Sequence, residues 1–192
     1  MRSDSTSHTK RLIIVGIWFA LALIVGASGI LESLLEPRIQ AILFGLTALV
    51  LLSYWRVRSF KGWVDSLPIK TIIAAHLSRF VGFYFLFLYG RCELPYQFAV
   101  IGGWGDIIVA TLAILVLFLP TSGSRGRIIV LAWNTIGLAD ILFVVITAGR
   151  LALTEPQSMI ALTHLPMSLL PLFLVPIIIA THIIIFARLR TQ

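Results

Sequence analysis

The sequence predicts an all-α integral membrane bundle of about six transmembrane helices, and three observations support this fold class. Hydrophobic residues make up 59% of the chain and charged residues 12%, and the mean hydropathy is +1.01. A soluble chain of 192 residues has no core large enough to bury that much apolar surface. The apolar residues gather into runs of about 20, the length that crosses a bilayer as a helix. The basic residues are also divided unequally between the connections.

Six apolar runs are expected to cross the bilayer. In chain order they are Leu12–Leu31, Ile39–Val57, Pro68–Tyr89, Gln97–Leu119, Ile128–Gly149 and Leu165–Ala187. The first run could pass for a signal peptide, but its apolar part is too long and its cleavage-like stretch is weak, so we expect a retained helix. Residues 1–11 then form a short polar, basic tail, 12–189 a single transmembrane domain, and 190–192 a C-terminal tail.

Charged residues and turn formers separate these runs, and the basic residues favour alternate connections. One side would carry Arg2, Lys10, Arg11, Arg56, Arg58, Lys61, Lys70, Arg125, Arg127, Arg188 and Arg190, and the other only Arg38, Arg91 and Arg150. This bias predicts that both termini are cytoplasmic. The same distribution accounts for the net charge of +7, because basic loops interact with anionic lipid headgroups. Nucleic acid is therefore not expected as a partner.

Ionisable side chains inside the expected spans fall into two layers, and such residues usually face the protein interior. His76 and His182 form an inner layer, and Arg79, Asp106 and Asp140 a more central one. The neutral Asn134 is grouped with the Arg–Asp layer as a buried ion-pair or proton-relay candidate.

The two aspartates belong to a short echo, "GWGDI" at 103–107 and "GLADI" at 137–141. Small residues before each acid would let neighbouring helices approach closely. One arginine against two aspartates leaves one carboxylate in excess. The layer is interpreted as a structural lock between three helices, as a proton or ion relay, or as an anion- or substrate-binding site around Arg79.

The histidines are expected at matched depth on different helices. Opposed imidazoles are how membrane cytochromes hold b-type haem, so His76 and His182 are candidate haem ligands, and metal ligands only through haem iron. A structural hydrogen-bonding role and a proton-carrying or transition-metal role stay open. The last span also carries Pro166, Pro171 and Pro176, which predict a bent or broken helix.

Four stretches resemble a set of small multi-pass bacterial membrane proteins known as uncharacterised. These are "HLSRFVGFYFLFLYG", "ELPYQFAVIGGWGDIIVA", "WNTIGLADI" and "LPMSLLPLFLVP" followed by His182, and together they cover about residues 68–182. The resemblance implies a bacterial inner-membrane location and carries no activity.

Three functions are therefore compatible with the sequence: a b-type haem protein for electron transfer, a small proton- or ion-coupled transporter using Arg79, Asp106 and Asp140, and a non-catalytic subunit of a membrane complex. An enzyme is not favoured, because no nucleophile–base pair or open metal site is evident. The expected partners are the lipid bilayer and either a second copy or a larger complex. The small-molecule partner is left open.

Overall fold

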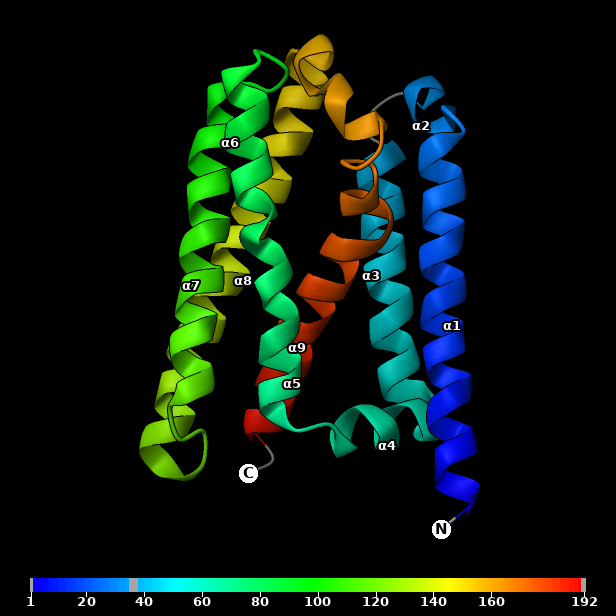
Figure 1. Cartoon of the computed structure of the whole chain (residues 1–192), viewed down its shortest axis with the longest axis vertical. Helices are drawn as coiled ribbons and strands as arrows, with labels where there is room; N and C mark the ends of the chain where they lie inside the picture. The colour runs from blue at the N-terminus through cyan, green and yellow to red at the C-terminus, as the bar shows by residue number, and fades with distance from the viewer. Residues whose placement is uncertain (1, 35–37, 191–192) are drawn as a thin grey trace.

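The computed structural model describes residues 2–34 and 38–190, and all regular secondary structure within these ranges is helical. Helices α1 (Arg2–Ala27) and α3 (Arg38–Arg56) stand together at one side of an elongated bundle (Figure 1). Helices α7 (Gly103–Phe118) and α8 (Gly123–Thr154) stand at the other side. Helix α9 (Val175–Arg190) lies between them and packs against both α3 and α8, which makes it the central helix.

Five segments are long and apolar enough to cross a membrane. They are Arg38–Arg56, Ile69–Gly90, Gln97–Phe118, Gly123–Thr154 and Leu170–Arg190. These segments confirm five of the six expected spans, with small shifts at their ends. The first expected span, Leu12–Leu31, is cut short because α1 ends at Ala27 and a separate turn, α2 (Ile30–Ser33), follows Gly29. The apolar part of α1 is shorter than the other five, so its crossing of the bilayer stays a prediction.

Helix α1 begins and α9 ends at the same end of the bundle, where α4 (Arg58–Ser66) lies across the base (Figure 1). Lys61 and Tyr54 both donate hydrogen bonds to Asp65, at 2.5 and 2.9 Å. Burial alone would raise the pKa of Asp65, but these hydrogen bonds outweigh it and hold the pKa below its ordinary value. Arg188 donates to the Leu67 carbonyl at 3.0 Å, which ties this end of α9 to the chain that follows α4. Which side of the membrane this end faces stays a prediction.

Three of the spanning segments are not continuous α-helices. The second consists of α5 (Ile69–Ala75), a 3-10 turn η1 (His76–Val81) and α6 (Gly82–Gly90). The third opens with a π-helical turn, η2 (Gln97–Gly102). The last opens with another, η4 (Leu170–Leu174).

The last span, expected at Leu165–Ala187, therefore begins later than predicted. Residues 164–168 form a bend and turns after the 3-10 helix η3 (Pro156–Thr163), and the π-helical turn η4 begins at Leu170. Pro166 lies in this stretch of turns, where its missing backbone N–H does not interrupt a helix, while Pro171 and Pro176 lie inside η4 and α9.

Two large apolar clusters fill the bundle, one above the other along the helices, and a smaller third one joins α1, α2 and η4. One large cluster contains Phe85, Phe98 and Val144, and the other contains Ile72, Trp133 and Ile185. Arg79, Asp106 and Asp140 lie between the two large clusters along the chain, whereas His182 on α9 is flanked by Ala180 and Ile184 of the second. The polar groups are therefore enclosed by apolar side chains towards both ends of the bundle.

Candidate functional site

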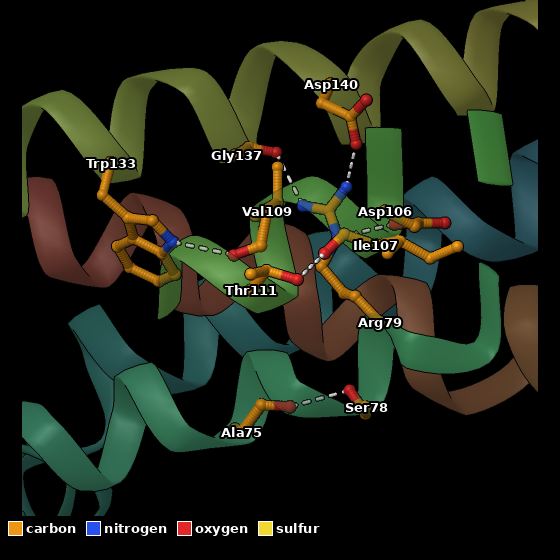
Figure 2. Close-up of polar contacts among 10 residues, drawn as sticks. All are labelled: Ala75, Ser78, Arg79, Asp106, Ile107, Val109, Thr111, Trp133, Gly137 and Asp140. Carbon is orange, nitrogen blue, oxygen red and sulfur yellow. Dashed lines mark hydrogen bonds and ion pairs between the residues drawn. The ribbon is translucent and has the colours of Figure 1, made fainter. Parts of the chain in front are cut away.

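A fully buried arginine forms the centre of the polar region. Arg79 donates from Nε to Asp106 Oδ1 at 2.6 Å and from Nη1 to the carbonyl of Gly137 at 2.9 Å. Its Nη2 donates to Asp140 Oδ2, so the guanidinium joins η1 to α7 and α8 (Figure 2). The three sequence-predicted residues of the central layer thus meet in one ion-pair cluster. The carbonyl of Gly137 is an additional partner that the sequence did not reveal.

Missing side chains at glycines create the space for this cluster. A Cβ at Gly82 would lie 2.3 Å from the carbonyl oxygen of Gly103, so the backbones of α6 and α7 touch at this crossing. A Cβ at Gly105 would overlap the Asp140 carboxylate, which occupies the place of a side chain. The small residues of "GWGDI" therefore allow the close helix approach that the sequence predicted.

The two carboxylates differ in their surroundings. The side chain of Asp106 is 4% exposed, whereas that of Asp140 is 17% exposed and lies at the outer edge of the α7–α8 contact. With Arg79 always charged, two ionised aspartates leave the cluster with one negative charge in excess. An uncompensated charge at membrane depth is unfavourable, so one additional proton or cation would stabilise the cluster.

The two histidines, expected at matched depth on different helices, lie in direct contact. His76 and His182 are both fully buried, and their ring centroids are 4.2 Å apart. The ring of Trp133 lies beside both, with centroid distances of 5.0 Å to His76 and 5.6 Å to His182. Its indole N–H donates to the carbonyl of Val109 at 3.2 Å (Figure 2), which fixes the indole against α7.

Hydrogen bonds fix the tautomer of each ring. The Thr181 hydroxyl donates to the backbone of α9, so its oxygen accepts from His76 Nε2 at 3.2 Å. The Asn134 amide nitrogen donates to the His182 carbonyl, which turns its oxygen towards His182 Nδ1 at 2.8 Å. His76 is therefore protonated at Nε2 and His182 at Nδ1.

The remaining ring nitrogens have no partner. His76 Nδ1 and His182 Nε2 are both buried without a hydrogen-bond donor. A buried acceptor without a donor costs about 1–3 kcal/mol, so two of them in one contact are unfavourable for the neutral pair. These two nitrogens are the main unsatisfied feature of the polar region.

Gly137 links the two layers. Its carbonyl accepts from Arg79 on one side, and on the other a Cβ at this position would lie 2.5 Å from His182 Cε1. The glycine of "GLADI" thus makes room for an imidazole as well as for a close helix contact. This role could not be predicted, because the spacing of residues on α8 does not show which side chain of α9 lies against Gly137.

The structure also changes one assignment and adds two residues. Asn134, grouped by sequence with the Arg–Asp layer, instead binds His182, because it lies one turn from Gly137 on the side of α8 that faces α9. Thr181 and Trp133 complete the histidine layer and were not predicted. The adjacency of Thr181 to His182 and of Trp133 to Asn134 was the available signal.

The packing of the histidines does not fit a haem between them. A bis-histidine haem places its porphyrin between the two imidazoles, whereas these rings touch. One feature does fit a metal ligand: each ring has one nitrogen held by a neighbour and the other free. The haem hypothesis thus requires the rings to separate, and it stays a prediction. An absorption spectrum of protein produced with ample haem tests it, since a Soret band lost in His76→Ala and His182→Ala is expected only for a haem protein.

Fold and site together define a multi-helix protein with membrane-spanning segments and a buried His/Arg/Asp cluster at their centre. Residues 36–190 match the family described as Domain of unknown function (DUF8737), and the chain belongs to this family. The match covers all five long apolar segments and the whole cluster, and it leaves out α1 and α2. No curated protein and no solved structure matched the chain.

Proposed function

We propose that this protein binds and moves protons across the membrane, as a small proton-coupled carrier that uses Arg79, Asp106 and Asp140. The observation that carries the proposal is the excess carboxylate. A fully buried arginine is held between two aspartates, and the cluster becomes formally neutral only when it takes up one proton.

The cluster also lies where the helices are least regular. Arg79 sits in the 3-10 turn of the second spanning segment, and Asp106 follows the π-helical turn that opens the third. Short 3-10 and π segments inside helices frequently mark hinges and functional sites. A proton carrier needs such hinges, because apolar clusters now separate the charges from both ends of the bundle.

A cavity of about 550 Å³ lies between α3, α8, η3 and η4, towards the end of the bundle opposite to α4. Its lining includes Val144, about one helical turn from Asp140 on α8, and it reaches the rim at Glu32. This volume suits a small molecule. The cavity supports a carrier in which a solute enters from this end while the proton is held at the cluster.

A pH jump on reconstituted vesicles tests the proposal without knowledge of the solute. Protein in proteoliposomes on a solid-supported membrane should show a transient charge displacement when the outside pH is changed. Asp106→Asn and Asp140→Asn should abolish this signal while the purified variants stay monodisperse and helical. Asp65→Asn, which changes an aspartate of α4 outside the spanning segments, is the matched control and should retain it.

Parent vesicles that give no more charge displacement than protein-free vesicles would overturn the proposal. Equal signals in the parent and in both cluster variants would do the same. The bacterial inner-membrane location and the assembly into a homodimer or a larger complex stay predictions.

A further inference from the structure

We infer that His76 and His182 form a second binding site for the same proton, so that it moves between the carboxylates and the histidine pair inside the bundle. The inference rests on the proposed function and deepens it. The evidence is the pairing of two orphaned nitrogens in one layer with one excess carboxylate in the next.

The orphaned nitrogens require a donor that the packing does not supply. His76 Nδ1 and His182 Nε2 have almost no accessible surface, so a water molecule does not fit against them in this arrangement. A proton needs no such space. Bound at either nitrogen, it removes one orphaned acceptor from a pair of rings whose centroids are 4.2 Å apart.

The exchange leaves the net charge of the two layers unchanged. Trp133, Asn134 and Thr181, which contact the pair, are neutral, and the charges of the adjacent layer are those of Arg79, Asp106 and Asp140. With the proton on a carboxyl group, Arg79 and one carboxylate sum to zero. With the proton on the histidines, two cations and two carboxylates also sum to zero. The transfer breaks one carboxyl O–H bond and forms one imidazole N–H bond, so the net charge of the buried region does not change.

Gly137 couples the two sites mechanically. A Cβ at this position would lie 2.5 Å from His182 Cε1, and the carbonyl of the same residue accepts from Arg79 at 2.9 Å. A ring that shifts to share a proton therefore moves α8 against the guanidinium, which changes how Arg79 is shared between Asp106 and Asp140. Proton position and ion-pair geometry are linked through one residue.

Nitrogen NMR of histidine-labelled protein in nanodiscs tests the inference. The chemical shifts distinguish each neutral tautomer from imidazolium, and His76→Asn and His182→Asn assign the signals. In the parent, acidification should convert the two neutral tautomers into a species with imidazolium character while the protein stays folded. In Asp106→Asn, where a histidine proton would leave an excess positive charge, the imidazolium signal at the same pH should fall about tenfold or more.

The outcomes separate this inference from the proposed function. Rings that keep their neutral tautomers at every pH at which the parent is folded would overturn the inference, even if charge displacement is observed. Imidazolium without charge displacement in vesicles would support the inference and contradict proton transport. A one-to-one complex with Ag⁺ that both histidine variants abolish, with no imidazolium signal, would identify a soft-metal site and also overturn it.

Discussion

Arg79 and the histidine pair are equally buried, yet their hydrogen bonding differs. The guanidinium donates to three acceptors on two helices, whereas the histidines leave two acceptors without a donor. All three side chains have no exposed surface, so burial does not explain the difference. A buried charge whose hydrogen bonds are all made holds the helices together. A pair of acceptor nitrogens without a donor can still bind a proton. We therefore expect loss of the Arg79 guanidinium to affect folding most, and substitution of the histidines to have a smaller effect on folding.

Loss of the arginine should have the largest effect. Arg79→Leu leaves two carboxylates without their counter-charge, and breaking a buried ion pair in this way costs about 3–5 kcal/mol. We expect little folded protein, or a large drop in the denaturant midpoint of unfolding in micelles. Arg79→Lys keeps the charge but cannot reach three acceptors, so it should fall between the parent and Arg79→Leu.

Replacement of the whole cluster separates its structural role from its role in transport. The triple variant Arg79→Leu, Asp106→Leu and Asp140→Leu removes all three charges together, and such replacements are often neutral or stabilising. We expect it to recover most of the stability lost in Arg79→Leu and to show no charge displacement. A triple variant that keeps the parent's charge displacement would show that this cluster only holds the helices together.

Much of this arrangement could be predicted from the sequence. Ionisable residues in long apolar runs had to face inward, and topology placed Arg79 with the two aspartates and His76 with His182. The individual hydrogen-bond partner of each side chain could not be predicted. Asn134 was assigned to the wrong layer because helical rotation, and not depth, decides which neighbour a side chain reaches.

The ends of the helices were harder to predict. Hydropathy marks where apolar residues lie but not where backbone hydrogen bonding changes, so the 3-10 turn at His76–Val81 and the π-helical turns left no periodic signal. The prolines of the last span predicted a break without fixing its place. For α1, the apolar residues continue past Ala27 although the helix does not, because Gly29 adopts a left-handed conformation.

A methyl group at the junction of the two layers should have an intermediate effect. In Gly137→Ala the new Cβ would overlap the His182 ring, and such overpacking typically costs about 1–3 kcal/mol. We expect a lower melting temperature together with a smaller imidazolium signal. Gly45→Ala is the matched control, because a Cβ there meets nothing within 4 Å, and it should not lower the melting temperature and should leave the imidazolium signal unchanged. Equal behaviour of the two variants would contradict the contact between Gly137 and His182.

The smallest expected effect is a difference in stability between His182→Leu and His76→Leu. Each replacement removes one orphaned acceptor. His182→Leu also deprives the Asn134 oxygen of its only donor in the described structure, which costs about 1–3 kcal/mol. In His76→Leu the Thr181 hydroxyl keeps its backbone hydrogen bond, so His182→Leu should be the less stable of the two variants. Chemical unfolding of both variants under one condition measures the difference. A larger loss in His76→Leu would mean that Nδ1 of His76 has a donor in solution, and the contrast between the satisfied arginine and the unsatisfied pair would then no longer hold.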